Sequence, residues 1–359
     1  MIELGITTFG ETTILEETNQ SYSHPERIRQ LVAEIELADQ VGLDVYGIGE
    51  HHREDFAVSA PEIVLAAGAV RTNNIRLSSA VTILSSNDPI RVYQQFSTID
   101  ALSNGRAEIM AGRGSFIESF PLFGYDLADY DDLFNEKMDM LLAINSATNL
   151  DWKGHLTQTV NERPIYPRAL QRQLPIWVAT GGNVDSTIRI AEQGLPIVYA
   201  TIGGNPKAFR QLVHIYKEVG SRNGHKPEQL KVAAHSWGWI EEDNQTAIDR
   251  YFFPTKQTVD NIAKGRPHWS EMTKEQYLRS VGPEGAIFVG SPEVVAHKII
   301  GLVEALELDR FMLHLPVGSM PHKDVLNAIK LYGKEVAPIV RKYFERIKAD
   351  LVCFFIVRL

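Results

Sequence analysis

The chain has few of the features that mark disulfide-stabilised, membrane-spanning or nucleic-acid-binding proteins. It contains a single cysteine, Cys353, so an intramolecular disulfide and a zinc site built from cysteines are both excluded. No apolar run reaches the roughly 18 residues that are needed to span a bilayer. The net charge is −9, and the basic residues form no cluster that would follow a phosphate backbone. These absences argue against a membrane or a nucleic acid as the main partner.

The first residues also lack the pattern of a secretion signal. Residues 1–5 are typical of a first β-strand and contain no succession of charged, apolar and small residues. Together with the single cysteine, this predicts a cytoplasmic protein. The composition, with 44% hydrophobic and 23% charged residues, is ordinary for a globular protein with a large core. A length of 359 residues allows two average domains, but α/β barrels of this length form single units.

Short apolar runs alternate with longer amphipathic stretches along almost the whole chain. In the segment 25–41, for example, Ile28, Leu31 and Ile35 recur at roughly helical spacing. Runs such as 197–199 are apolar on both faces, as in a parallel sheet that is covered on both sides. We expect strands at residues 2–8, 43–48, 76–84, 107–111, 175–180, 195–200, 231–240 and 309–315. We expect helices at residues 25–41, 59–71, 88–103, 131–147, 184–193, 205–222, 291–307 and 322–346.

This alternation predicts a closed (β/α)8 TIM barrel over residues 1–348, although an open, doubly wound sheet fits the same pattern. Two polar, aromatic-rich segments, 151–174 and 241–285, stand out as insertions. Loops at the C-terminal ends of the strands form the active-site face of a barrel, so we expect these insertions to be lids or substrate walls. Residues 349–359 form a hydrophobic tail that has no place in the alternation.

Three ionisable residues, Glu50, His51 and His52, follow the second predicted strand. Histidine transfers protons near neutral pH, and a neighbouring carboxylate could hold its tautomer. The alternative is a polar strand end whose histidines satisfy backbone groups. We expect no metal site here, because adjacent histidines in an extended segment point to opposite faces and no third ligand is placed.

Two glycine turns at the ends of predicted strands could hold a phosphate. Gly112 and Arg113 follow the fourth strand, where a glycine lets a ligand approach the backbone and a guanidinium can pair with phosphate. Thr180, Gly181 and Gly182 join the fifth strand to a helix, whose first N–H groups and dipole favour an anion. Neither turn carries the Walker or the dinucleotide-binding fingerprint, so each also fits a plain tight turn.

Other strands leave further alternatives open. Residues 77–82 are small in the middle of the third strand, which leaves room for a flat ring or simply suits barrel packing. His235 shares one strand face with Trp237 and fits a core as well as a ligand wall. His314 and His322 flank the end of the last strand and could line the mouth of the barrel, at the C-terminal ends of the strands.

Taken in this order, the segments resemble the luciferase-like flavin monooxygenase family. The resemblance extends from Ile2 to about Phe344. It implies a barrel that binds FMN non-covalently at the ends of its strands, with a non-proline cis peptide bond at Ala80–Val81. The motifs that carry the resemblance are residues 50–52, 74–91, 100–106, 112–114 and 175–182.

The resemblance also implies roles for individual residues of this sequence. His51, with Glu50 beside it, matches the active-site histidine of the family, and Arg113 would bind the phosphate of FMN. In the light-emitting luciferases a reactive cysteine stands at the position of Gly112 and an acidic residue at that of Thr180, so here the phosphate site must depend more on backbone donors. The residues expected to contact the flavin are Ala80, Val81, Ala111, Gly112, Arg113, Thr180, Gly181, Gly182, Ala200 and Thr201.

The function that the resemblance implies is an FMNH2-dependent monooxygenase that acts with O2 on a small organic substrate. Many relatives receive reduced FMN from a separate NAD(P)H:flavin reductase, and family members commonly form homodimers. The protein would hold the flavin ring, exclude water and orient the substrate. Three alternatives remain: a hydride-transfer enzyme of the same fold that uses the deazaflavin F420, a flavin-binding protein without turnover, and an unrelated phosphate-binding barrel such as an aldolase or an isomerase. The last usually binds phosphate after strands seven and eight, whereas the glycine turns here follow strands four and five.

Overall fold

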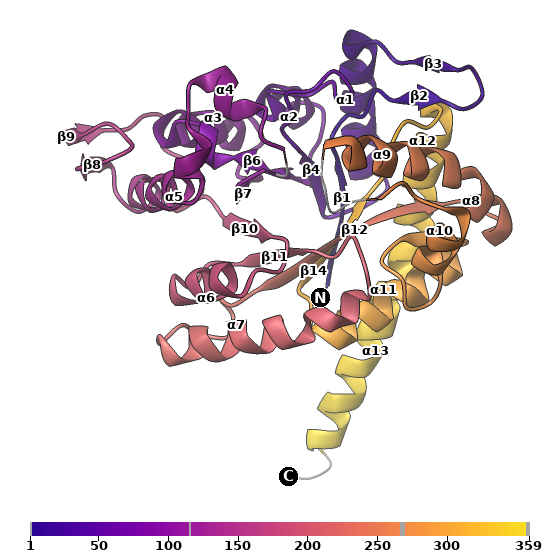
Figure 1. The fold of residues 1–359 in the computed structure, drawn as a ribbon. Coiled ribbons are helices and arrows are strands. Elements are labelled where there is room, and N and C mark those ends of the chain that lie inside the picture. The colour runs from indigo at the N-terminus through magenta and orange to yellow at the C-terminus, as the bar shows by residue number, and fades with distance from the viewer. Residues whose placement is uncertain (1, 115, 266–269, 357–359) are drawn as a thin grey trace.

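In the computed structural model, which describes residues 2–114, 116–265 and 270–356, the parallel strands labelled in Figure 1 pair in a closed ring. Each barrel strand pairs with the next barrel strand along the chain, and the last pairs with the first, with Thr7 opposite His314. This closure confirms the predicted TIM barrel and excludes the open sheet. The barrel strands are β1 (Glu3–Thr8), β4 (Val45–Ile48), β5 (Arg76–Ser79), β7 (Ala107–Gly112), β10 (Ile176–Thr180), β11 (Ile197–Ala200), β12 (Val232–Ile240) and β14 (Arg310–His314).

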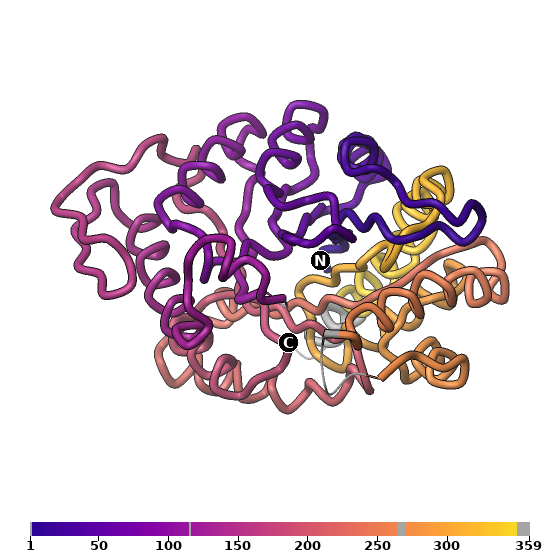
Figure 2. Tube along the Cα trace, turned by 45° about the horizontal axis from the view of Figure 1, so that its top comes forward, coloured from indigo at the N-terminus to yellow at the C-terminus, as the bar shows by residue number. Residues whose placement is uncertain are grey.

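Helices follow the strands and surround the barrel (Figure 2). Several begin as the sequence predicts: Asp88 caps α3 by accepting the N–H of Arg91 at 3.0 Å, and a proline occupies its first turn. The predicted helix at 322–346 is one continuous helical run that contains a π-helical turn, η4 (Tyr332–Val336). The surrounding helices are α1 (His24–Gln40), α2 (Pro61–Ala69), α3 (Pro89–Leu102), α5 (Tyr130–Ser146), α6 (Val184–Glu192), α7 (Arg210–Arg222), α11 (Pro292–Leu306), α12 (His322–Leu331) and α13 (Ala337–Ile356).

The helix α13 extends away from the barrel at its C-terminal end (Figure 1). It runs to Ile356 and therefore includes most of the hydrophobic tail expected at 349–359. Residues 357–359 and the side chains of residues 350–356 lie outside the described part of the structure. Within the described part, no helix combines the length and the apolar character needed to cross a bilayer.

Most of the inserted elements lie at the C-terminal ends of the strands. The segment 241–285, expected to be such an insertion, contains α8 (Asn244–Arg250), α9 (Phe252–Gly265) and α10 (Lys274–Val281), and β13 (Phe288–Gly290) follows it. Three shorter elements follow β1, β5 and β7. They are the hairpin of β2 (Ile14–Leu15) and β3 (Gln20–Ser21), the short strand β6 (Thr82–Ile83) with the turn η1 (Leu84–Ser86), and the helix α4 (Ser119–Phe123) followed by the turn η2 (Leu127–Asp129).

The other expected insertion, 151–174, does not wall the strand ends. It contains most of the hairpin of β8 (Asn149–Trp152) and β9 (Val160–Pro164), which follows a helix instead of a strand. In both overall views this hairpin projects to one side, far from β1 (Figures 1 and 2). Its tip lies along α5, where the carboxylate of Glu136 accepts backbone N–H groups of residues 155–157. The expectation of a lid at 151–174 is therefore wrong.

Side chains of the strands alternate between the barrel interior and the surrounding helices, as the period of two requires. On β7, Ala107, Ile109 and Ala111 pack in the large cluster that the strands share with the helices. Met110 instead packs in a smaller inner cluster with Trp177 and other inward-facing residues. The inner cluster fills the middle of the barrel, so the barrel is a packed core with two polar ends.

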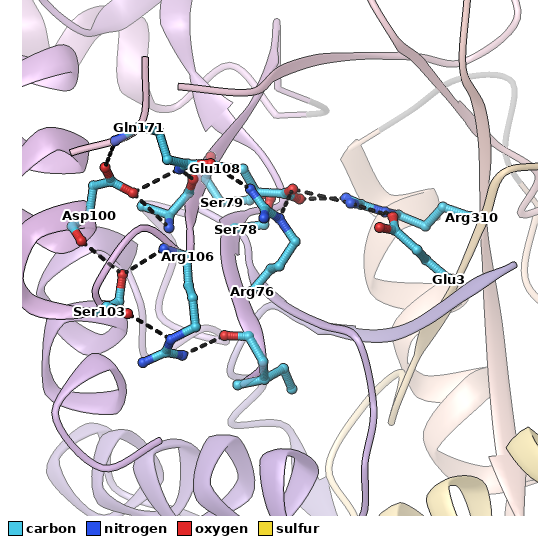
Figure 3. A network of polar contacts seen from close by, with 12 residues as sticks. Glu3, Arg76, Ser78, Ser79, Asp100, Ser103, Arg106, Glu108, Gln171 and Arg310 are labelled. Atoms are coloured by element: carbon cyan, nitrogen blue, oxygen red, sulfur yellow. Dashed lines mark hydrogen bonds and ion pairs between the residues drawn. The ribbon is translucent and has the colours of Figure 1, made fainter. Parts of the chain in front are cut away.

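The N-terminal end of the barrel interior is closed by a buried ion-pair network (Figure 3). Arg310 of β14 pairs with Glu108 of β7 and with Glu3 of β1, while Arg76 of β5 reaches Glu108 at 3.0 Å. Burial opposes the ionisation of Glu108, but the two guanidinium groups outweigh it and lower the pKa of this carboxyl group. The Arg310 guanidinium also lies 4.3 Å from the Trp177 ring, which joins the network to the inner cluster.

Removal of one partner from this network should cost far more stability than removal of a surface ion pair. We expect Arg310→Met to lower the free energy of unfolding by about 3–5 kcal/mol, because the buried carboxylate of Glu108 loses its main partner. The control is Arg71→Met, whose partner Glu36 forms an exposed pair that contributes about 0–1 kcal/mol. Urea unfolding at pH 7 measures both. Equal losses in the two variants would show that the network adds nothing beyond a surface pair.

Candidate active site

The innermost layer at the C-terminal end of the barrel divides into a small-residue half and a polar half. Its residues face the barrel interior, because alternation along each strand places them on the same side as the inner cluster. That cluster contains Ala80 and packs against Ala179. The small half consists of Ala80, Gly112, Ala179 and Ala200. The polar half consists of Thr7, His235 and His314. The two halves meet where Ala200 of β11 stands opposite His235 of β12.

In the small half, the side chains are too small to cover the backbone of the strands. The peptide bond Ala80–Val81 is cis, as the resemblance implied, and it separates β5 from β6. A Cβ atom at Gly112 would lie 2.9 Å from the Val81 side chain, so only glycine lets Val81 pack here without displacement. Four neighbouring strands therefore present little more than backbone and methyl groups to the mouth, which suits a flat ring.

His51 lies in an aromatic enclosure next to this wall. Its ring stacks on Phe56 with a centroid distance of 4.3 Å and meets the edges of Phe9 at 4.5 Å and Phe116 at 5.3 Å. Its Nδ1 atom is buried and has no hydrogen-bond partner among the described residues. Burial, followed by repulsion from neighbouring cationic groups, lowers the pKa of His51 to about 3. A neutral imidazole with an unpaired nitrogen can accept or share a proton with a bound ligand.

The carboxylate of Glu50 contacts Ile83, Asn87 and His52 instead of the expected partner, His51. Its carboxylate accepts the N–H of Ile83 at 2.9 Å and the side-chain amide of Asn87 at 3.0 Å, and it lies 2.9 Å from Nε2 of His52. Residues 50 and 52 point to one side of an extended chain and residue 51 to the other. Glu50 therefore fixes His52 and the segment after the cis peptide bond, and it does not orient His51 directly.

Arg113, at the end of β7, occupies the corner where a phosphate was expected. Its guanidinium group lies 4.4 Å from the centre of the Phe134 ring, and its Nε stands 2.9 Å from the exposed carboxylate of Asp131. Its hydrogen bonds to Ser186 (3.4 Å) and Asn135 (3.5 Å) are long. The cation is thus held by an aromatic face and by weak or surface contacts, which a phosphate group can displace.

The turn after β10 forms the other side of this corner. Gly182 adopts a φ of +100°, which favours glycine, and its N–H donates to Thr180 Oγ1 at 3.3 Å. At Gly181 a Cβ atom would meet no atom within 4 Å, so the space above this residue is open. Asn183 then caps α6 by accepting the N–H of Ser186 at 2.9 Å.

Two residues of α6 join this corner although the sequence analysis did not select them. Ser186 and Arg189 line a narrow crevice together with Arg113. Their spacing of three residues places them on one helix face, directly after the glycine turn. That spacing was the available signal, and it is too common on helices to be specific.

Two residues expected to contact the flavin serve the barrel wall instead. The side chain of Ala111 faces the helices, because it alternates with Met110 and Gly112. Thr201 is fully buried: its N–H donates to the carbonyl of His235 at 2.8 Å, and its hydroxyl lies 2.6 Å from that of Ser236. At most their backbone can line the mouth.

The histidines left open by the sequence separate in the structure. His235 and His314 stand together in the polar half, with 3.3 Å between Nε2 of His235 and Nδ1 of His314. His322 lies elsewhere, between α1 and α12, where its Nδ1 is 3.2 Å from the buried carboxylate of Glu34. The interpretation that His322 lines the mouth is therefore wrong. Sequence analysis missed Glu11, whose carboxylate lies 2.6 Å from His314, because no motif surrounds it.

A cavity of about 790 Å³ lies beside the mouth. It is bounded by the β2–β3 hairpin, by the loop residues Glu54 and Asp55 next to Phe56, and by one face of α9. Aromatic side chains, Tyr22 and Phe253, share its wall with charged and amide groups of α9. The part of the chain that the structure describes holds no group of three or more His, Cys, Asp or Glu side chains suited to a metal ion.

His51 should make the folded protein sensitive to acid. Its pKa is about 3 in the folded chain and near 6.5 in the unfolded chain, so the unfolded chain binds more protons between these pH values. Stability is therefore lost as the pH falls from about 6.5 towards 3. We expect His51→Asn to lose about 2 kcal/mol less unfolding free energy than the parent protein between pH 6 and pH 4.5. Urea unfolding at both pH values measures this.

The control for this measurement is His214→Asn, which replaces a solvent-exposed histidine of α7. It should follow the parent protein at both pH values. If His51→Asn and the parent lose stability in parallel, His51 is protonated in the folded chain and is not a neutral group.

Comparison with known proteins agrees with this architecture. The family model described as luciferase-like monooxygenase matches residues 3–307. Over 332 residues the chain is 24% identical to the uncharacterized protein y4vJ of Sinorhizobium fredii, covering 90% of this chain and 94% of that protein.

Several solved structures share the fold. The monooxygenase RslO1 from Streptomyces bottropensis superposes with a TM-score of 0.79 at 20% identity, covering 94% of this chain and 99% of that one. The oxygenating constituent of 3,6-diketocamphane monooxygenase from Pseudomonas putida, solved with FMN, gives 0.72 at 18% identity, covering 95% and 99%. The coenzyme F420-dependent tetrahydromethanopterin reductase of Methanopyrus kandleri gives 0.70 at 19% identity, covering 94% and 99%. With the family model matching most of its length, this chain belongs to the luciferase-like monooxygenase family.

Proposed function

We propose that this protein binds reduced FMN at the mouth of the barrel and acts as an FMNH2-dependent monooxygenase on a small organic substrate. The observation that carries the proposal is the combination of the small half of the mouth, the cation of Arg113 beside it and the neutral imidazole of His51. Family membership and the likeness to a structure solved with FMN support it. Membership also removes the aldolase or isomerase alternative, since those barrels belong to other families.

The residues present fit an FMN molecule. Arg113, Ser186 and Arg189 would hold the phosphate, with the open turn at Gly181 and Gly182 beside them. The isoalloxazine ring would lie against the wall of small residues that ends at Ala200. His51 offers the orphaned nitrogen, Nδ1, that such a site requires. Packing of the barrel alone does not require a wall of small residues with a cation beside it.

Each protein group has a separate task in this proposal. Reduced flavin would supply the electrons for reaction with O2. His51, neutral at physiological pH, accepts or returns a proton at the ligand. Phe9, Phe56 and Phe116 surround His51 and exclude water from it. The single cysteine favours a location in the reducing cytoplasm. We therefore expect an NAD(P)H:flavin reductase of the same compartment to deliver FMNH2.

Arg113 should distinguish FMN from riboflavin, which lacks the phosphate. We expect Arg113→Met to weaken binding of FMN by about 10–150-fold, the equivalent of about 1.5–3 kcal/mol for a charge-assisted hydrogen bond, and to leave riboflavin binding unchanged. The control is Arg29→Met, on the exposed side of α1. Anaerobic titration of the cofactor-free protein with FMN, FMNH2 and riboflavin, followed by flavin fluorescence and absorbance, measures these affinities.

The same titration with F420 decides between the two cofactors. Binding of F420 alone would move the protein to the hydride-transfer branch of the fold. Binding of FMNH2 without O2-dependent product formation, when a reductase and candidate substrates are supplied, would leave a flavin-binding protein without turnover. If none of the cofactors binds, the proposed function is wrong.

We also propose a homodimer through α2 and α3. Apolar side chains are exposed on these packed helices and on the loop that follows β9, and Gln94 of α3 ties this loop in place by donating to the carbonyl of Tyr166 at 2.9 Å. Ile63 and Val70 are seven residues apart and share one helix face. A twofold pair would place this patch against its copy. The exposed residues of the patch are Ile63, Val70, Leu102, Tyr166 and Leu170.

Charge in this patch should dissociate the dimer. We expect the parent protein to sediment as a dimer at micromolar concentration and the double variant Ile63→Glu, Leu102→Glu to sediment as a folded monomer. Leu278→Glu, which changes an exposed apolar residue of α10, is the control and should remain dimeric. Sedimentation velocity measures all three. A monomeric parent protein, or a dimer that survives both glutamates, contradicts the proposed interface.

A further inference from the structure

Three side chains form a continuous hydrogen-bonded line across the polar half of the mouth. The carboxylate of Glu11, just after β1, lies 2.6 Å from Nε2 of His314, at the end of β14. The other ring nitrogen of His314 lies 3.3 Å from Nε2 of His235, on β12. Glu11 is 3% exposed and His314 is fully buried, so this line runs inside the protein.

The inner end of the line is rigidly held. The second oxygen of Glu11 accepts the hydroxyl of Thr8 at 3.2 Å and the N–H of Phe9 at 3.3 Å. His314 also has the hydroxyl of Thr7 at 3.3 Å from its Nδ1. Each ring nitrogen of His314 therefore has a defined neighbour, which fixes the orientation of the imidazole.

The outer end of the line is free to act on a ligand. His235 is partly exposed, and its Nδ1 has no hydrogen-bond partner among the described residues. Its strand neighbour is Ala200, the last residue of the bare wall where the flavin ring is proposed to lie. The Phe9 ring lies next to both histidines of the line and to His51. Its centroid is 4.3 Å from that of His314, 6.4 Å from that of His235 and 4.5 Å from that of His51.

We propose that Glu11, His314 and His235 form a proton relay into the mouth, separate from His51, in which His235 is the residue that exchanges a proton with the bound ligand. Glu11 and His314 are positioning residues that act through His235. The part played by the ligand rests on the proposed function. The relay itself is a property of the protein without cofactor.

The proposed relay has a definite arrangement of protons at rest. Both ring nitrogens of His314 carry a proton, Nε2–H donates to Glu11, Nδ1–H donates to Nε2 of His235, and His235 carries its own proton on Nδ1. When His235 gives the Nδ1 proton to a ligand, its Nε2 takes the Nδ1 proton of His314. One proton leaves, His314 becomes neutral, and His235 ends with its proton on Nε2. Reversal of the two transfers takes a proton from the ligand.

Two of the three imidazoles at the mouth, those of His51 and His235, stay neutral. Burial, followed by repulsion from His314, lowers the pKa of both His51 and His235, so these two imidazoles stay neutral beside it. His52 and Arg53 repel a proton on His51 in the same direction.

The groups that face Glu11 from other elements leave its pairing with His314 intact. Arg27 of α1 interacts with Glu11 but is paired with Glu34, which lies at 0% exposure between α1 and β4. Tyr46 of β4 and Tyr251, before α9, also lie within electrostatic range of Glu11, and burial raises the pKa of both phenols, so they remain uncharged. The side chain of Glu11 thus keeps His314 as its partner.

The test is the protonation state of each histidine nitrogen in the cofactor-free protein. Long-range ¹H–¹⁵N spectra of protein labelled with ¹⁵N-histidine distinguish the two neutral tautomers and the imidazolium, and His235→Gln and His314→Gln assign the signals. At pH 7 we expect two protons on His314 and the single proton of His235 on Nδ1. A singly protonated His314, or a proton on Nε2 of His235, in the parent protein overturns the relay.

A carboxylate substitution then tests the coupling. In Glu11→Gln, His314 should become neutral and the proton of His235 should move from Nδ1 to Nε2, while Glu11→Asp should preserve the parent pattern. Glu108→Gln, which removes a buried carboxylate from the network at the other end of the barrel, is the control and should leave both signals unchanged. An unchanged His235 tautomer in folded Glu11→Gln overturns the coupling.

This result is independent of the flavin titration. If the tautomers behave as expected and no flavin binds, the relay stands and the proposed function fails. If flavin binds and the tautomers do not respond to Glu11, the proposed cofactor site stands and the three residues serve only to join β1, β14 and β12.

Discussion

Closure of the parallel sheet is the constraint on which the rest of this structure depends. Once β14 pairs with β1, every second side chain of every strand must enter one confined interior. That interior has room for three kinds of layer: an ion-pair network at the N-terminal end, an apolar middle, and the mixed layer at the mouth. The chemistry of the mouth is therefore decided by which residue occupies the last inward position of each strand.

The apolar middle separates two polar ends that would otherwise interact. Met110, Trp177 and Val198 lie between the network of Arg310 and Glu108 and the histidines at the mouth. The charges at the N-terminal end are balanced within their own network. The pKa values of His51 and His235 at the mouth are consequently set by burial and then by repulsion from His314.

The mouth itself combines the small half with the polar half. Four strands from β5 to β11 contribute small residues, while β12, β14 and β1 contribute histidine and threonine. A planar ligand on the small half would thus have titratable groups at its edge, His51 on one side and His235 on the other. This arrangement connects the fold to the acid–base chemistry that a flavin-dependent oxygenation needs.

Much of this was predictable because it is local. Strand and helix positions follow from periodicity and caps, as at Asp88 and Asn183, and the composition of the segments after β7 and β10 predicts the glycine turns found there. The motifs of the family also placed the cis peptide bond correctly at Ala80–Val81. Alternation in an extended chain would also have directed Glu50 away from His51, had the strand end been certain.

The remaining features depend on residues that are far apart in the chain. Glu11, His235 and His314 are separated by up to 303 residues, and no pattern along the sequence connects them. Likewise the hairpin at 149–164 resembles a lid in composition, but its position after a helix and its contacts with Glu136 place it outside the mouth. The sequence by itself determined the barrel and the family, because these depend on short-range propensity and on contiguous motifs. Only the tertiary structure decided which polar groups meet at the mouth, because sheet closure and register bring distant strands into contact.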